Sequence, residues 1–320
     1  MIFAIVFGVF VIMSFASPYF MNTSNILALL LGLSIEALIA VGMTNLMVSG
    51  GFDMSVGSVV AFTGAATALS MKAGLTTVLA ILVGLVIGAL IGLFNGFIIA
   101  KVGINPFVTT LASLSIFRGL TLIITGGKNI SGLDKGFEAI GQASFLGIQM
   151  PIWYALILIV TGDILLRKSR FFRQNYYIGG NEKAAHLSGI PVDKIKILNY
   201  VIVGLLAGLA GIVMTARLGS ASVTAGSGLE LRVITAVIIG GASLQGGEGT
   251  VVGAFLGSLL MALITNALTL LGVDVYWQTF VIGATLLTAV LIDRFGKIRK
   301  EKKRSKKGGA QVCNTQVSKG

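Results

Sequence analysis

The sequence predicts an all-α, polytopic membrane protein with about ten transmembrane helices. Of its 320 residues, 55% are hydrophobic and only 11% are charged, and the mean hydropathy is +0.94. Soluble domains carry about 25% charged residues, whereas a run of about 20 apolar residues crosses a bilayer as a helix. Several such runs follow one another here, so we expect a multi-pass protein of the cell (plasma or inner) membrane.

The boundaries of the expected spans follow from the polar turns, glycines and prolines between the apolar runs. A polar turn at 22–25 follows the first run, and a mixed loop at 126–150 precedes the sixth. The run 234–239 is too short to cross before a glycine-rich stretch, which predicts a re-entrant or half-helix near 234–249. Full spans are expected at 2–17, 26–48, 54–71, 75–100, from 106 onward, 151–166, 197–216, 250–271 and 275–292.

Basic residues concentrate in one loop and in the C-terminal tail. Between Arg167 and Lys196 there are seven basic and two acidic residues, and from Arg294 to the end ten basic and one acidic. Cytoplasmic loops carry such an excess of Lys and Arg. An even number of crossings puts both termini on one side, so we expect the loop 167–196, the N-terminus and the C-terminus to be cytoplasmic. The tail 297–320 is expected to be disordered. Its basic residues either anchor the topology or contact anionic lipid.

The composition also excludes several classes of function. The single cysteine, Cys313, leaves no partner for an intrachain disulfide, and the single histidine, His186, excludes a multi-histidine metal site. No phosphate-binding loop motif is present, so any ATP must be hydrolysed by another chain. We predict no catalytic residue, no metal and no cofactor, and no nucleic-acid binding, because the basic residues do not form a face on a folded surface. The apolar N-terminus lacks a preceding basic region, which favours a retained helix over a cleaved signal peptide.

Glycines at helical spacing predict close contacts between helices. Gly84, Gly88, Gly92 and Gly96 recur every four residues, and a second pair with the same spacing lies at 204 and 208. Such spacing lines one face of a helix with bare backbone, which lets another helix approach closely in lipid.

A short polar passage interrupts the apolar chain after the glycine pair 179–180. Asn181 is a favoured cap that accepts a hydrogen bond from a first-turn amide, and Glu182 suits the helix dipole. Gly189 permits a left-handed exit, and Pro191 cannot continue the helix. The pattern predicts a helix of about two turns, which is too short to be stable alone in water. On spacing alone, it is either a structured loop between two membrane helices or a docking element.

This passage resembles the coupling helix of ABC importer permeases, in the Gly-Gly-Asn-Glu-x-Ala-Ala-x-x-Ser-Gly-Ile version of the ribose-type sugar permeases. The stretch 50–58 is similar to the family's Gly-Gly-x-Asp-Leu-Ser-Val-Gly-Ser segment, and 240–249 is similar to its Gly-Gly-x-Ser-x-x-Gly-Gly-x-Gly segment. Asn105, Pro106 and Phe107, with the later pair Arg118 and Gly119, resemble a further family feature. The motifs occur in family order over nearly the whole chain.

The resemblance implies that residues 1–296 form the transmembrane permease domain of an ATP-driven importer for a monosaccharide, with a ribose-like sugar first. Autoinducer sugars or nucleosides are the alternative substrates within the family. It also implies an ABC ATP-binding subunit, an extracytoplasmic sugar-binding protein, and a second permease copy as a homodimer or a close relative as a heterodimer. The residues that it assigns to coupling with the ATP-binding subunit are Asn181, Glu182, Ala184, Ala185, Leu187 and Gly189; the alanines are expected to allow close approach and Leu187 to make an apolar contact.

Charged and polar side chains inside the spans are candidates for the transport path or its gates. A central charge costs about 2.5–3.5 kcal/mol on insertion scales, so Glu36 and Arg118 should face the interior, water or each other. They form a structural ion pair or line the path. Asp53 either caps the next helix or acts in coupling or gating at the membrane boundary. The remaining candidates, each of which is either a weak solute contact or interhelical glue, are Asn45, Asn95, Thr109, Ser113 and Asn266.

Two other classes of protein remain as alternatives. A self-sufficient ion-coupled carrier would need intramembrane carboxylates near the midplane, for which Glu36 is the one good candidate. A membrane enzyme would need clustered His, Asp or Cys at active-site spacing, which the sequence lacks.

Overall fold

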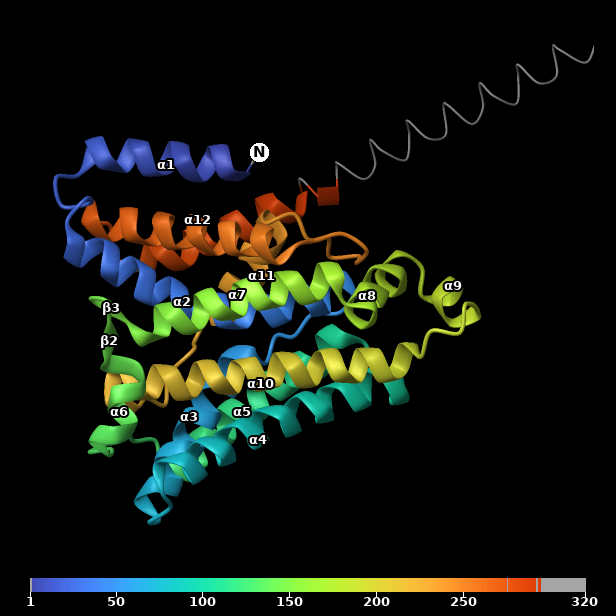
Figure 1. The fold of residues 1–320 in the computed structure, drawn as a ribbon, viewed down its shortest axis with the longest axis horizontal. Helices are drawn as coiled ribbons and strands as arrows, with labels where there is room; N and C mark the ends of the chain where they lie inside the picture. Colours follow the sequence, from blue (N-terminus) through green and yellow to red (C-terminus); the bar gives the residue numbers. More distant parts are fainter. Residues whose placement is uncertain (1, 275, 292, 295–320) are drawn as a thin grey trace, which may run out of the picture.

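The structure, a computed structural model, describes residues 2–274, 276–291 and 293–294. The tail 297–320, with its expected disorder and Cys313, lies outside the described residues. Within them the long helices run side by side as one bundle, with short elements gathered at its two ends (Figure 1).

Helices dominate the described chain, which confirms the all-α prediction. Six are long and apolar enough to cross a membrane, judged by length and composition: α2 (Thr23–Val48), α4 (Thr77–Phe97) continued by the π-helical turn η1 (Ile98–Val102), α5 (Pro106–Thr125), α7 (Met150–Lys168), α10 (Val192–Leu218) and α12 (Val251–Leu270). Shorter apolar helices are α1 (Ile2–Ala16), α3 (Val56–Lys72), α11 (Leu229–Ile239) and the helix Tyr276–Leu291. The protein is therefore a polytopic membrane protein.

The connecting elements lie at the two ends of the bundle (Figure 1). At one end are α8 (Arg170–Gly180) and α9 (Glu182–Leu187); at the other are α6 (Lys135–Gln142), β2 (Ser144–Phe145) and β3 (Ile148–Gln149). Strands β2 and β3 pair antiparallel, and β1 (Ile130–Ser131) pairs antiparallel with β4 (Ser220–Ala221).

Two of these helices were not expected from the sequence. The loop 126–150 contains α6, whose Phe137 is fully buried in a cluster with Ala68 and Ile212. The glycine pair 179–180 ends α8 instead of loosening a loop. A Cβ on Gly179 would lie only 2.0 Å from the Val48 carbonyl oxygen, so tertiary contact rather than backbone freedom explains this glycine.

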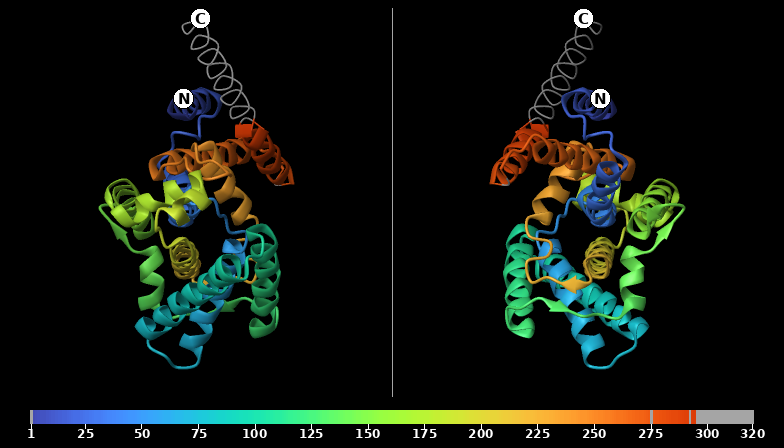
Figure 2. Two further views of the ribbon diagram at one scale, coloured as in Figure 1. Left: turned by 90° about the vertical axis from the view of Figure 1, so that its right-hand side faces the viewer. Right: turned by 90° about the vertical axis from the view of Figure 1, so that its left-hand side faces the viewer.

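Helix α10 is central to the packing. Viewed along the bundle, it lies between the side formed by α2 and α12 and the side formed by α3 and α4 (Figure 2). A Cβ on Gly88 would lie 2.5 Å from the Gly204 carbonyl oxygen, and one on Gly92 would lie 2.2 Å from that of Tyr200. The predicted close packing along the glycine stripe is therefore confirmed, and α10 is the helix that fills it.

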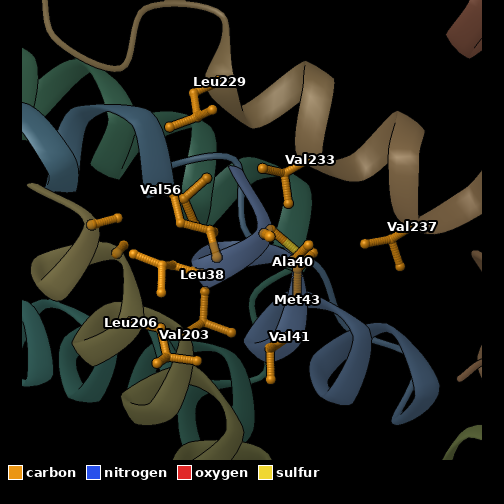
Figure 3. Packing of buried hydrophobic residues seen from close by; sticks show 14 of the residues in the cluster. Leu38, Ala40, Val41, Met43, Val56, Val203, Leu206, Leu229, Val233 and Val237 are labelled. Atoms are coloured by element: carbon orange, nitrogen blue, oxygen red, sulfur yellow. The ribbon is translucent and has the colours of Figure 1, made fainter. Parts of the chain in front are cut away.

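The largest buried apolar cluster joins α2, α3, α10 and α11. Leu38 and Met43 of α2 meet Val56, Val203 and the valines of α11 in this cluster (Figure 3). A second cluster packs α1 against α12. The buried apolar residues thus form one large central cluster with smaller clusters beside it.

The first turns of the short helices α3 and α11 contact each other. Residues 49–55 separate α2 from α3, and residues 219–228 separate α10 from α11. The space beside Gly57 is filled by the Gly226 carbonyl oxygen and Oε2 of Glu230, which lie 2.3 and 2.2 Å from the position of a Cβ. The half-helix predicted near 234–249 is α11, which begins earlier, at Leu229, and ends before the glycine-rich turn.

Substitution of Gly92 by Ala should lower the free energy of unfolding by about 1–3 kcal/mol, because the added methyl group overlaps the Tyr200 carbonyl and forces α4 and α10 apart. Thermal unfolding in detergent measures the effect. Gly119→Ala on α5 is the matched control, because no atom lies within 4 Å of its Cβ position. Equal stability of the two variants would contradict the packing argument.

Candidate functional site

Helix α9 is built as the sequence predicts. The Oδ1 atom of Asn181 accepts a hydrogen bond of 3.0 Å from the amide of Ala184, which caps the first turn. Gly189 has φ +79°, so the chain leaves the helix in the left-handed conformation that glycine tolerates. The helix stands at the end of the bundle, beyond the long helices (Figure 1).

A small apolar cluster holds α9 on its own chain. Ala185 is 3% exposed and packs with Ile178 of α8 and with Val192 and Ile195 of α10. The side chain of Ala185 is thus mostly covered by its own chain and reaches only the lining of the neighbouring groove. The spacing pattern could not tell which of the two adjacent alanines faces inward; Ala184 is the exposed one.

Ion pairs add a second attachment of α9. Glu182 accepts from Lys196 of α10 at 2.6 Å, and Asp193 accepts from Lys101 of η1 at 2.8 Å. His186 lies 3.9 Å from Asp193. Exposed ion pairs are individually weak, about 0–1 kcal/mol, but here they fix the direction of a helix that has few other contacts.

The outer surface of α9 carries one large exposed apolar side chain among polar ones. Leu187 is 91% exposed, although it is a large apolar side chain. Next to it lies a groove of about 480 Å³ lined by Tyr176, Tyr177, Gly180, Asn181, Ala184, Ala185, Ser188 and Ile190. An exposed leucine beside a groove is the form of a docking surface.

Three of the predicted path or gate residues meet in one buried polar cluster. Asp53 accepts from the amide and hydroxyl of Ser55 at 2.7 and 2.6 Å, and Asn95 donates to the Ser55 hydroxyl at 3.0 Å. Asn95 also donates to Asp53 at 3.4 Å, and Ser113 donates to Asn95. All four are at most 1% exposed, so the cluster joins the start of α3 to α4 and α5 and is closed to solvent.

The expectation that Asp53 caps α3 is wrong. The residue before α3 is Ser55, and no side chain accepts from the first-turn amides. Asp53 instead forms a local turn with Ser55 and reaches across to α4, a tertiary contact that the favoured-cap rule does not anticipate.

Glu36 and Arg118 do not pair with each other. The Nη1 atom of Arg118 donates to the carbonyls of Val223 and Ala225, at 3.0 and 2.9 Å, in the turns before α11. Glu36 instead lines a cavity of about 230 Å³ between α2, α11 and α12, where Arg232 supplies the opposite charge. The pairing of Glu36 with Arg118, one of the two alternatives, is therefore wrong, because Arg118 binds backbone carbonyls and the basic residue that shares the cavity with Glu36 is Arg232 of α11.

The remaining candidates act in different places. Asn266 lines the same cavity as Glu36 and exchanges amide hydrogen bonds of 2.7 and 3.2 Å with Asn25 of α2. Thr109 is buried on α5. Asn45 hydrogen-bonds with Asn175 and Asn199.

Arg232, Asn175 and Asn199 were missing from the predicted set. The sequence gives only a weak indication that Arg232 belongs to a site: it is a charged residue four positions after the small-residue segment that ends at Gly228. Asn175 lies within the expected loop 167–196 and Asn199 near the start of the expected span 197–216, so neither position signals a buried amide. Only the packing of α8 and α10 shows that both are fully buried.

These features define the class of a polytopic transport permease. Buried polar contacts tie the long helices together, a cavity with both apolar and polar lining lies between α2, α11 and α12, and the short helix α9 is exposed at the end of the bundle. In the part of the chain that the structure describes, no three His, Cys, Asp or Glu side chains gather as a metal site.

Comparison with known proteins agrees. The family described as "Branched-chain amino acid transport system / permease component" matches residues 25–290, and the chain belongs to this family. It is similar to the ribose import permease protein RbsC of Bacillus subtilis (strain 168), 45% identical over 286 residues that cover 89% of each chain. The RbsC of Escherichia coli (strain K12) is 41% identical, over 88% of this chain and 89% of the relative.

The L-arabinose transport system permease protein AraH of Escherichia coli (strain K12) is 39% identical over 292 residues, covering 91% of this chain and 89% of the relative. No solved structure matches this chain. The resemblance to ribose-type permeases is therefore confirmed.

Replacement of Asp53 by Asn should lower the free energy of unfolding by about 1–3 kcal/mol, because an amide either loses an acceptor for Ser55 or turns a donor toward the donor of Asn95. Thermal unfolding in detergent measures it. Asp274→Asn is the control, since Asp274 is exposed and its oxygen only caps the amide of Tyr276. An unchanged midpoint for Asp53→Asn would mean that the cluster does not depend on the carboxylate.

Proposed function

We propose that this chain is the membrane-spanning permease subunit of an ATP-driven importer for a monosaccharide, with ribose as the first candidate. The relatives named for ribose and L-arabinose are 39–45% identical over about nine-tenths of the chain, which supports a pentose. The single observation that carries the coupling role is α9, a capped short helix with Leu187 exposed at the end of the bundle.

The energy for transport comes from a separate chain in this proposal. The sequence has no phosphate-binding loop motif, so an ATP-binding subunit has to supply the work. That subunit docks on Leu187, Ala184 and the adjacent groove. When it closes on ATP, it displaces α9, and the ion pair of Glu182 with Lys196 passes the displacement to α10.

The proposed topology has ten crossings, with both termini and the loop 167–196 in the cytoplasm. The basic excess in that loop and in the tail supports this orientation. The opposite end, with α6, β2 and β3, then faces an extracytoplasmic sugar-binding protein. A second permease copy completes the assembly, as a homodimer in the simplest arrangement.

The cavity lined by Glu36, Arg232 and Asn266 is the part of the structure that best suits a sugar path. Thr265 and Thr269 also line it, so carboxylate, guanidinium, amide and hydroxyl groups face one space. Several weak polar contacts of this kind allow a hydroxyl-rich solute to enter and leave. Asp53, Asn45, Asn95 and Ser113 are at most 6% exposed and hold helices together in this conformation.

Glu36→Gln should lower the rate of ATP-driven sugar uptake several-fold in proteoliposomes, because Arg232 then lacks its opposite charge beside the path. The basal ATPase rate of the complex should stay the same, since Glu36 lines the cavity between α2, α11 and α12 and not the docking surface on α9. Asp274→Asn, an exposed carboxylate outside the cavity, is the control. Uptake equal to that of the unaltered complex would remove this cavity from the path.

Leu187→Asp should reduce ATP-driven uptake of labelled ribose by about tenfold or more, because a charge replaces a central apolar contact of the docking surface. The assay uses the permease reconstituted with its ATP-binding subunit and sugar-binding protein. Thermal unfolding of the permease should not change, since Leu187 is 91% exposed. Leu146→Asp, a substitution at a residue 77% exposed at the other end of the bundle, is the matched control.

Two outcomes would overturn the proposal. Sugar uptake by the permease alone without ATP would support an ion-coupled carrier instead. The orientation is tested with Leu187→Cys and Leu146→Cys in a Cys313→Ser background. Labelling of position 187 by an impermeant maleimide from outside intact cells would place α9 on the wrong side for an ATP-binding subunit.

A further inference from the structure

Three asparagines from different helices form a closed ring of hydrogen bonds. Asn45 of α2 donates to Asn199 of α10 at 2.7 Å, and Asn199 donates to Asn175 of α8 at 2.9 Å. Asn175 completes the ring by donating to Asn45 at 2.6 Å. Each amide therefore donates one hydrogen bond and accepts one within the ring, so every member depends on the other two.

The ring is buried, and one further hydrogen bond extends it. Asn175 and Asn199 are fully buried, and Asn45 is 6% exposed. Asn199 also donates to the hydroxyl of Ser49 at 3.1 Å, at the end of α2. Buried amides without partners are costly, so the loss of one member leaves the other two with unmet donors or acceptors.

The position of the ring matters more than its stability. Helix α8 precedes α9 in the chain and helix α10 follows it, so Asn175 and Asn199 lie on the two helices that flank the docking helix. Asn45 lies on α2, nine residues after Glu36, which is about 14 Å along a helix. The ring thus connects α8 and α10, the two helices on either side of α9 in the chain, to α2, which also lines the cavity of Glu36 and Arg232.

A second contact holds α8 in the same place. The amide of Gly247 donates to the Val48 carbonyl at 2.8 Å, and both lie against Gly179, where a Cβ would be 2.0 Å from Val48 and 2.4 Å from Gly247. The hydroxyl of Tyr176 donates to the Gly249 carbonyl at 2.7 Å. The end of α8 is therefore fixed against α2 on one side and against the turn before α12 on the other.

We propose that the ring of Asn45, Asn175 and Asn199 is a positioning element that makes α2 move with α8 and α10 when the ATP-binding subunit displaces α9. This rests on the proposed function. Without the ring, α8 can shift relative to α2 when the ATP-binding subunit displaces α9, so α2 does not follow the movement. ATP is then hydrolysed without a matching movement of the wall that carries Glu36.

The test is the number of ATP molecules hydrolysed per sugar transported. Asn175→Ala in the complete reconstituted complex should raise this ratio by about fivefold or more, the usual size of a coupling between two sites. The basal ATPase rate should stay unchanged, because the asparagines do not touch the ATP-binding subunit. A purely structural role would reduce the amount of folded complex but leave the ratio of the surviving complex as it was.

Ser113→Ala is the matched control. It also removes a buried hydrogen bond between helices, but α4 and α5 do not flank α9. Its ratio should remain that of the unaltered complex. Asn175→Asp is the second variant if Asn175→Ala fails to fold, because it keeps the shape and the acceptor for Asn199 and loses the donor to Asn45.

The outcomes separate the two proposals. If the unaltered complex shows no ATP-dependent sugar uptake, the proposed function fails. If the unaltered complex transports sugar with ATP, the proposed function stands. The positioning role is then overturned if Asn175→Ala or Asn175→Asp keeps the ratio of ATP to sugar within about twofold of the unaltered complex, because such a change is smaller than a typical coupling between two sites. An equal rise of the ratio in Ser113→Ala would also overturn it, since general loosening would then explain the effect.

Discussion

The structure depends on backbone-to-backbone contact at glycines. Gly88 and Gly204 bring α4 and α10 together, Gly240 and Gly253 bring the end of α11 against α12, and Gly179 admits Val48 and Gly247. In lipid there is little hydrophobic force between helices, so close van der Waals contact has to supply much of the cohesion. Every other contact in the bundle is set by the spacing that these glycines allow, including the polar ties that are only about 3 Å long.

Those polar ties are grouped by depth and by helix. One group joins α3, α4 and α5 around Asp53 and Asn95, and another joins α2, α8 and α10 through three asparagines. A polar group in the bilayer interior must find its partners inside the protein. Both groups are buried, so in this conformation they fix helix positions and leave solute contacts to the cavity beside Glu36.

The distribution of attachments around α9 explains how a short helix can transmit force. Ala185 and its small apolar cluster hold the inner side of α9, the ion pair of Glu182 with Lys196 ties its first turn to α10, and Leu187 is exposed on the outside. A helix fixed on one side and exposed on the other moves with its support when a partner presses on it. The short helices α3 and α11 meet near their first turns, where the Gly226 carbonyl and Glu230 lie against Gly57.

The sequence by itself determined the class of fold, the family, the glycine-lined face of α4, and the capped helix at 181–189. These follow from composition and from spacing within one segment, which local physics controls. Tertiary structure alone decided the partners: that Asp53 ties to Asn95 rather than capping α3, that Arg232 rather than Arg118 faces Glu36, and that Ala185 is buried while Ala184 is exposed. Partners from distant segments depend on how helices are rotated and paired. A single sequence shows which side chains need a partner, but not which helix will supply it.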